Sequence, residues 1–208
     1  MKHKYIIGID EVGRGPLAGP VAVGVFCIQA DTKAKAKKIL TKMFPEARDS
    51  KKLLPQKREE IFKKIRQAAN DGHISYTVQF ESAKNIDTKG LSWAIRNCIK
   101  KGLRKIKVAQ PVDPSTDLIL LDGGLKAPGE YLNQKTIIRG DDSEIIISLA
   151  SIAAKVTRDR HMRKLAKMHP VYGFEVHKGY GTAFHRRIIA QKGCCIEHRR
   201  SFLRNLAN

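Results

Sequence analysis

Near its N-terminus the chain reads Tyr5-Ile6-Ile7-Gly8-Ile9-Asp10-Glu11-Val12-Gly13-Arg14-Gly15-Pro16. The apolar run predicts a buried strand that carries two adjacent acids to its end. The glycines that follow allow backbone amides to approach a ligand closely. Because the formal charge of the chain is +20, two neighbouring carboxylates favour a bound divalent metal ion or a cationic partner.

Composition limits the class of protein. The 208 residues are enough for one domain with a sizeable core, and a hydrophobic fraction of 42% argues against disorder. Lys and Arg number 40 against 20 Asp and Glu, an excess that suggests a polyanionic partner, most simply nucleic acid. An anionic membrane surface is the alternative, but no apolar run is long enough to span a bilayer.

The cysteines and the first residues bear on location. Cys27, Cys98, Cys194 and Cys195 show no metal-binding spacing, which predicts reduced thiols in a cytoplasmic protein. The first four residues lead directly into the predicted strand without an apolar leader, so no secretory signal is expected.

Hydrophobic periodicity predicts strands that alternate with helices after an initial hairpin. Beyond the strand that begins at Tyr5, strands are expected at Val21–Ile28, Ile74–Phe80, Leu118–Leu121 and Lys135–Ile138. Helices are expected at Asp31–Phe44, Pro55–Ala69, Thr88–Ile106, Glu144–Met168, Ala183–Gln191 and Arg199–Asn208. This order predicts an α/β architecture with a mixed sheet.

Acidic residues fall at the ends of three predicted elements. Asp10 and Glu11 end the first strand, Asp122 ends the fourth, and Asp141 and Asp142 lie between the fifth strand and the long helix. Acids at the ends of neighbouring strands converge on one point, and several oxygens at one point suit Mg²⁺ or Mn²⁺. In a basic protein, such a cluster suggests metal-assisted phosphoryl chemistry.

Each of the later acids also has a purely structural interpretation. Asp122-Gly123 is ordinary turn chemistry. Asp141 is a possible helix N-cap, with Glu144 three residues on completing a box-like pattern. Asp159 lies among arginines and favours an ion pair on a helix surface. Four histidines recur every eight residues, a spacing that fits neither helix nor strand and that we interpret as chance: His161, His169, His177 and His185.

Six motifs, in order along the chain, closely resemble those of type 2 ribonuclease H, the ribonuclease HII family. They are DEVGRGPLAGPV from Asp10, DSKKL from Asp49, LDG from Leu121, RGD from Arg139, ASIAAKVTRD from Ala150 and HKGYGT from His177. The matches run from residue 5 to about residue 202, nearly the whole chain. A lone Gly-Arg-Gly is a weak signal, but six ordered motifs are a specific one.

The resemblance implies an RNase H-like fold, with a five-stranded mixed sheet flanked by helices. It implies a catalytic domain over residues 1–182 and a C-terminal helical extension over residues 183–208 packed on it. Four carboxylates are implied as catalytic and metal-binding: Asp10, Glu11, Asp122 and Asp141. Asp141 is preferred to Asp142 because it directly follows Gly140, as in the family pattern.

The resemblance also implies the reaction. Two Mg²⁺ or Mn²⁺ ions at the carboxylates would hydrolyse the RNA strand of an RNA/DNA hybrid, or the 5′ side of a single ribonucleotide in duplex DNA, leaving 3′-hydroxyl and 5′-phosphate ends. The implied setting is a cytoplasmic monomer that acts in ribonucleotide excision repair and replication, with no membrane partner.

The same resemblance assigns substrate-binding residues. The backbone of Gly13, Arg14 and Gly15 is implied to read the 2′-hydroxyl, and Tyr180 to stack on a sugar at the junction between RNA and DNA. The stretch Ser50, Lys51 and Lys52 is expected to contact phosphates, although lysine runs are commonly just solvated. For the glycines a tight turn, and for Tyr180 a half-buried core ring, are the structural alternatives.

Three other functions are compatible with parts of the pattern. A non-catalytic RNA-binding protein would account for the charge but gives no role to the acids. A metal-free ribonuclease with histidine as acid and base would leave a 2′,3′-cyclic phosphate. A type 3 ribonuclease H or a transposase-like nuclease would place similar acids on the same fold.

Overall fold

A single five-stranded sheet organises the chain in the computed structural model, which describes residues 4–47 and 53–203. Its strand order is β3-β2-β1-β4-β5. The strands are β1 (Tyr5–Val12), β2 (Val21–Gln29), β3 (Ser75–Glu81), β4 (Leu118–Asp122) and β5 (Gln134–Ile137). Strands β1, β2 and β3 pair antiparallel, whereas β4 and β5 run parallel to β1. The mixed sheet expected from the sequence is therefore confirmed.

The parallel half of the sheet decides where the acids meet. Strands β1, β4 and β5 run in the same direction, so their carboxyl ends lie at one edge of the sheet. Asp10 pairs with Gly24 of β2, and its neighbour Ile9 pairs with Leu121 of β4, the residue before Asp122. Residues that are more than 100 positions apart in the sequence are thereby brought side by side.

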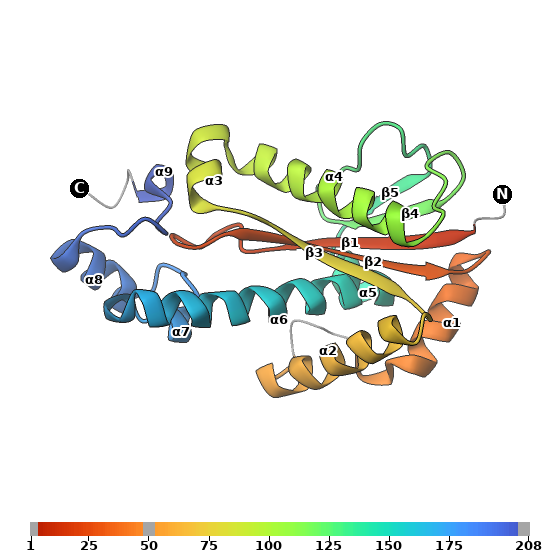
Figure 1. Cartoon of the computed structure of the whole chain (residues 1–208), viewed down its shortest axis with the longest axis horizontal. Helices are drawn as coiled ribbons and strands as arrows, with labels where there is room; N and C mark the ends of the chain where they lie inside the picture. The colour runs from red at the N-terminus through yellow and green to blue at the C-terminus, as the bar shows by residue number, and fades with distance from the viewer. Residues whose placement is uncertain (1–3, 48–52, 204–208) are drawn as a thin grey trace.

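Helices cover both faces of the sheet (Figure 1). One face carries α1 (Lys33–Met43), α2 (Pro55–Asn70) and α6 (Ile145–Met168), and the other carries α4 (Leu91–Ala109). The first twelve residues of α6 are buried almost all round, because the helix lies between the sheet and α2. In the described parts of the chain no helix is long and apolar enough to cross a membrane.

Glycines on the central strands let α6 approach the sheet closely. A Cβ on Gly8 would lie 2.5 Å from the carbonyl oxygen of Ile146, and one on Gly24 would lie 2.1 Å from that of Ala150. Real Cβ atoms do not approach backbone this closely, so both positions require glycine. The close packing fixes α6 against the strand that ends in Asp10 and Glu11.

Two of the differences between the observed and the predicted helices lie at positive-φ residues. The predicted helix Thr88–Ile106 is wrong at its start: α3 (Ala83–Lys89) ends at Gly90, which has φ +84°, and α4 begins at Leu91. A separate short helix, α5 (Gly140–Ser143), precedes α6, with Arg139 as its left-handed N-cap. Both interruptions change the chain direction at positive-φ residues, which hydrophobic periodicity does not report.

The C-terminal part folds back on the N-terminal turn. After the short turn η3 (Pro170–Tyr172), the helices α7 (Phe174–His177), α8 (Ala183–Lys192) and α9 (Arg200–Leu203) complete the described chain. An isolated antiparallel bridge joins Ala18 to His198. The backbone N–H of Arg199 donates to the Leu17 carbonyl, and that of Gly19 donates to the Glu197 carbonyl. The segment after α8 is thus hydrogen-bonded to the loop that follows β1.

Candidate active site

The carboxyl edge of the parallel strands holds a compact acidic cluster. Carboxylate oxygens of Asp10, Glu11 and Asp122 lie within 4.8 Å of one another. Asp10 is buried, with 4% of its surface exposed, and its Oδ1 accepts from the Glu11 amide at 2.8 Å. Asp141, 1% exposed, lines the same cleft, which has a volume of about 500 Å³. The four predicted acids therefore line one cleft, with three of them in close contact and Asp141 beside them.

Burial raises the pKa of two acids in this cluster, Asp10 and Glu11. Burial raises the pKa of Asp10 well above its usual range; a hydrogen bond with Ser151 opposes the shift, and the charges of Glu11, Asp122 and Asp141 add to it. Burial also raises the pKa of Glu11, against a hydrogen bond from Arg14. Because the raised pKa values of Asp10 and Glu11 oppose their ionisation, a bound cation that neutralises their charge is favoured at this place.

The loop after β5 fixes one of the carboxylates. The Asp122 Oδ1 accepts from the backbone N–H of Gly140 at 2.6 Å and more weakly from that of Asp141 at 3.4 Å. Gly123 has φ +54°, so the turn interpretation of Asp122-Gly123 also holds. The turn and the site role are compatible, because the backbone turns while the carboxylate binds the start of α5.

The alternative role of Asp141 as an N-cap is wrong. Asp141 lies inside α5, and the N-cap position belongs to Arg139. Glu144 caps α6 without a side-chain hydrogen bond to it, and its carboxylate instead pairs with Lys33. Asp142 is exposed and is absent from the carboxylate cleft.

The glycine–arginine turn forms another wall of the cleft. Gly13, Arg14, Gly15 and Tyr180 all line it. Tyr180 is 42% exposed, so it presents its ring at the surface of the cleft rather than to the core. The Arg14 guanidinium bonds Glu11 at 2.9 Å, which ties the turn to the acidic cluster. Carboxylates and turn are therefore adjacent.

Sequence reasoning missed three residues of the cleft. Arg58, Ser151 and Lys155 line it beside the acids. Arg58 donates to the Leu53 carbonyl at 2.6 Å, and Lys155 pairs with Asp159 at 2.8 Å. The partner of Asp159 is thus a lysine one turn earlier on α6. The predicted phosphate contacts Ser50, Lys51 and Lys52 lie outside the described residues.

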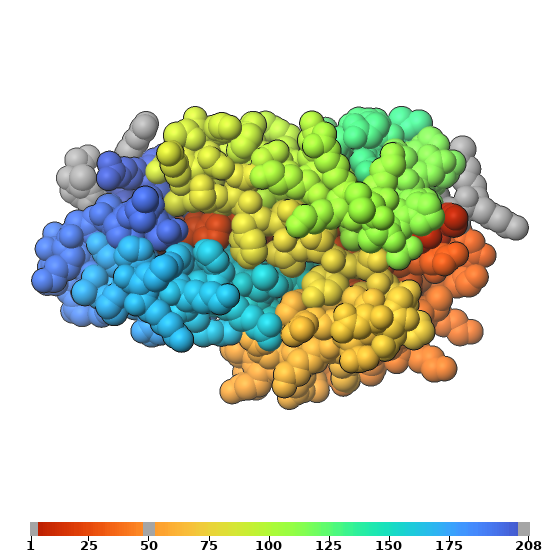
Figure 2. Space-filling model, in the orientation of Figure 1, coloured from red at the N-terminus to blue at the C-terminus, as the bar shows by residue number. Residues whose placement is uncertain are grey.

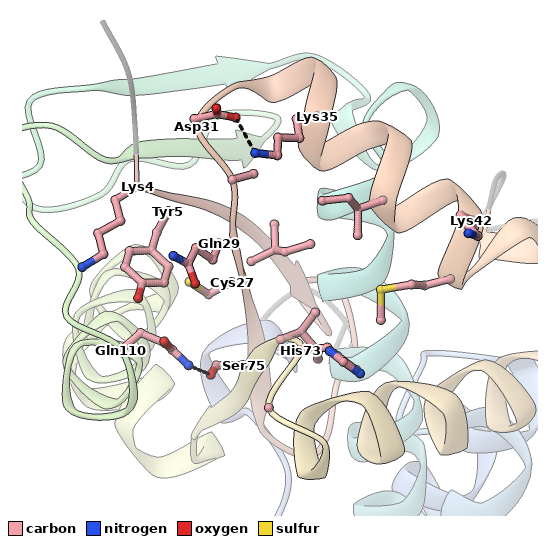
Figure 3. Close-up of a pocket in the computed structure, with 16 residues that line it drawn as sticks. Lys4, Tyr5, Cys27, Gln29, Asp31, Lys35, Lys42, His73, Ser75 and Gln110 are labelled. Atoms are coloured by element: carbon pink, nitrogen blue, oxygen red, sulfur yellow. Dashed lines mark hydrogen bonds and ion pairs between the residues drawn. The ribbon is translucent and has the colours of Figure 1, made fainter.

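A larger hollow of about 870 Å³ lies at the other end of the sheet, near the start of β1 (Figure 3). It is lined by Lys4, Lys35, Lys42 and His73, among others. These cations do not point to a common centre. Lys35 pairs with Asp31 at 3.3 Å, and Lys42 lies at the right of Figure 3, away from Lys4 at the left. The hollow lacks the acidic cluster, so we assign the chemistry to the carboxylate cleft.

Solved structures with a similar fold define the class. A ribonuclease HII from Archaeoglobus fulgidus, solved in complex with PCNA, has a TM-score of 0.71 at 23% identity, covering 98% of this chain and 97% of that chain. Ribonuclease H2 from Pyrococcus horikoshii has a TM-score of 0.66 at 26% identity, covering 97% and 96%. The protein has the RNase H-like fold, and the acidic cleft at its sheet edge places it among the hydrolases built on that fold.

Sequence comparison then gives the family. The family model for ribonuclease HII matches residues 7–205 of this chain. Ribonuclease HII from Caldicellulosiruptor bescii is 38% identical over 98% of this chain and 89% of its own length, and that from Clostridioides difficile is 39% identical over 98% and 72%. The chain belongs to the ribonuclease HII family. It is a type 2 ribonuclease H, a metal-dependent hydrolase that cleaves RNA in RNA/DNA hybrids.

Proposed function

We propose that this protein also cleaves on the 5′ side of a single ribonucleotide embedded in duplex DNA, and that it uses two Mg²⁺ or Mn²⁺ ions. The observation that carries the proposal is the adjacency of the acidic cluster to the Gly13–Gly15 turn and Tyr180 in one cleft. A carboxylate site beside a backbone turn allows one ribonucleotide to be recognised where it is cleaved. The products would carry 3′-hydroxyl and 5′-phosphate ends.

The residues present fit divalent cations. The cluster supplies only oxygen ligands, and the buried Oε2 of Glu11 has no hydrogen-bond partner in the described part of the chain. Asp10, Glu11, Asp122 and Asp141 would hold the ions. Ions bound there would lower the pKa of a water molecule and stabilise charge on the leaving oxygen.

The chain's own groups would orient the substrate. Burial of Asp10 and its hydrogen bond from the Glu11 amide hold that carboxylate in one orientation. The turn would approach the sugar, because no Cβ at Gly13 or Gly15 stands in the way. Tyr180 would stack on the neighbouring sugar. A 2′-hydroxyl both donates and accepts, so it can be distinguished from hydrogen by the backbone alone.

The experiment is cleavage of a DNA duplex with one ribonucleotide, with a matched all-DNA duplex as control, in Mg²⁺, Mn²⁺ or EDTA. We expect one cut 5′ to the ribonucleotide in either metal, none in EDTA and none in the all-DNA duplex. Mass analysis of the ends should give 3′-hydroxyl and 5′-phosphate. A 2′,3′-cyclic phosphate would refute the metal mechanism, and cleavage confined to long hybrids would refute the single-ribonucleotide activity.

Other parts of the proposal rest on the sequence. Roles in ribonucleotide repair and replication, a cytoplasmic location, a monomeric state, and the division into residues 1–182 and 183–208 stay predictions. Light scattering tests the monomer directly. Ser50, Lys51 and Lys52 as phosphate contacts predict that log affinity falls by roughly 0.9 for each phosphate neutralised, per unit of log salt. Replacing both lysines with Gln should reduce that slope.

A further inference from the structure

Arg199 is a fully buried cation that binds main-chain oxygens of the substrate-binding turn. Its guanidinium is 0% exposed. It donates to the carbonyls of Gly13 at 2.7 Å, Arg14 at 2.9 Å and Gly19 at 3.0 Å. All three acceptors are backbone carbonyls on the loop after β1. A buried guanidinium that is held only by carbonyls fixes the direction of each peptide group that it contacts.

This contact determines which way the amides of the turn point. In a trans peptide the C=O of one residue and the N–H of the next are antiparallel. Because the Gly13 and Arg14 carbonyls point at Arg199, the N–H groups of Arg14 and Gly15 point away from it. Neither amide donates a hydrogen bond to any group in the described parts of the chain. Two adjacent donors are thus oriented and available for an acceptor.

A second buried arginine holds the other side of the same loop. Arg158, also 0% exposed, donates to the carbonyls of Pro20, Ala18 and Lys178. Gly13 has φ +93°, and a Cβ there would lie 2.3 Å from the Arg158 Nε. The turn is therefore enclosed between two guanidinium groups. At the left of Figure 2 a small red area of the N-terminal segment is visible between the C-terminal segment, α3 and α6.

The residue before Arg199 is joined to Tyr180 by a directed chain of hydrogen bonds. The Cys195 N–H donates to His198 Nδ1 at 3.0 Å, so the neutral ring carries its proton on Nε2. That proton faces His185 Nε2 at 3.1 Å, and His185 Nδ1 in turn donates to the Tyr180 carbonyl at 2.9 Å. Every donor meets an acceptor only when both rings are neutral.

The surroundings of the His198 and His185 rings favour their neutral forms. His177 stacks on His185 with ring centroids 4.2 Å apart, and it also has one donor and one acceptor contact, to Tyr172 and Gly179. Burial and the proximity of other histidines lower the pKa of His198 to about 4. Burial also lowers the pKa of His185. The His198 and His185 rings are thus uncharged at neutral pH, and the chain of hydrogen bonds between them is complete.

We propose that His198 and Arg199 are a pair of positioning residues that sets the orientation and spacing of the two ribose-recognition elements. Arg199 orients the N–H groups of the Gly13–Gly15 turn, and His198, acting through His185, holds the backbone of Tyr180. The two residues are consecutive in the segment that bridges to Ala18, so one short stretch of backbone controls both elements. The inference rests on the proposed ribose recognition.

The alternative is that the pair only stabilises the fold. A purely structural role would lower stability, and with it binding to every duplex alike. A positioning role would lower affinity for a ribonucleotide more than affinity for the same duplex without it. The ratio of the two dissociation constants therefore separates the two roles.

The experiment measures that ratio with Ca²⁺ in place of Mg²⁺, for a duplex with one ribonucleotide and the matched all-DNA duplex. The variants are Arg199→Lys, which keeps the charge but not the planar fork, and His198→Gln. The matched control is Arg200→Lys, a neighbouring arginine that is exposed and whose backbone, not side chain, binds Asp87. Circular dichroism and calorimetric titration of Mn²⁺ check that the fold and the carboxylate site are intact.

We expect the dissociation constant for the all-DNA duplex divided by that for the ribonucleotide duplex to fall by about five- to tenfold in each test variant, which corresponds to the loss of about one hydrogen bond to the sugar. The same quotient should be unchanged in Arg200→Lys. If Arg199→Lys does not fold, His198→Gln decides the result. An unchanged ratio in the folded variants overturns the inference, and so does an equal fall in the control. If the wild-type protein itself shows no preference for the ribonucleotide, the proposed function fails, and the inference fails with it.

Discussion

The substitution Asp10→Asn distinguishes two effects of the acidic cluster: the loss of stability from repulsion between its charges, and the binding of metal. Asn keeps the shape of Asp10 and still accepts the Glu11 amide bond, but it removes one buried charge. Two ionised carboxylates whose oxygens lie within 4.8 Å of each other repel by at least about 3 kcal/mol at an effective dielectric constant of about 20. Proton uptake relieves part of this repulsion, so we expect the metal-free variant to be more stable than the wild-type protein by at least roughly 1 kcal/mol.

The difference in stability between the Asp10→Asn variant and the wild-type protein depends on pH. The pKa of Asp10 is raised in the folded state, mainly by burial. The folded protein therefore binds more protons than the unfolded chain between the ordinary Asp pKa and the raised value, and its stability falls as pH rises through that window. Asn does not titrate, so the advantage of the variant should be larger at pH 8 than at pH 5.

Metal should reverse the order of stability. A ligand at 100 times its dissociation constant adds about 2.7 kcal/mol to a protein that binds it, and the variant should lose most of that gain together with the activity. Thermal unfolding in EDTA and in saturating Mn²⁺ measures both effects; for a chain of this size, 1 kcal/mol moves Tm by roughly 2–4 °C.

The matched control is Asp142→Asn, which removes an exposed acid outside the cleft. Its Tm in EDTA should equal that of the wild-type protein, and so should its gain in Tm on addition of Mn²⁺. An Asp10→Asn protein that is less stable than wild type in EDTA, or that gains as much from Mn²⁺, would refute the assignment of this carboxylate to a metal site.

The remaining predictions concern the fourth acid, the packing of α6 and the histidine chain. Asp141→Asn should lower kcat by more than roughly 10- to 100-fold, the loss seen when a residue that only hydrogen-bonds a metal ligand is replaced. Asp142→Asn should leave steady-state cleavage unchanged. The opposite order would identify Asp142, not Asp141, as the fourth ligand. Gly24→Ala should destabilise the protein by about 1–3 kcal/mol in urea unfolding, since its Cβ would lie 2.1 Å from the Ala150 carbonyl, and a wild-type midpoint would contradict the close packing. The pKa of His198 is lowered to about 4 in the folded protein, so below about pH 6.5 the unfolded chain binds more protons than the folded protein does. Stability should therefore fall by up to about 3 kcal/mol between pH 6.5 and 4. His198→Gln should reduce this dependence on pH.

Much of the site could be read from local patterns. The period of the first strand and its two terminal acids predict a strand end with carboxylates, because side-chain alternation and strand length are properties of a few consecutive residues. Asp122 is found in the same way, at the end of Leu118–Leu121. Only the family resemblance favours Asp141 over Asp142 as the fourth acid. In the structure Asp141 lies in the cleft and Asp142 is exposed, a difference of one position on the single turn of α5.

The sequence by itself determined the strands, the chemical types of the site residues and, through ordered motifs, the family. Only the tertiary structure decided what supports them. Arg199 and Gly13 are 186 residues apart, and no periodic pattern connects them. The eight-residue histidine spacing interpreted as chance includes His177 and His185, which stack, and the ring bonded to His185 comes from outside that spacing, at His198. Local sequence reports secondary structure, whereas contacts between distant segments follow from how the C-terminal segment folds back on the turn after β1.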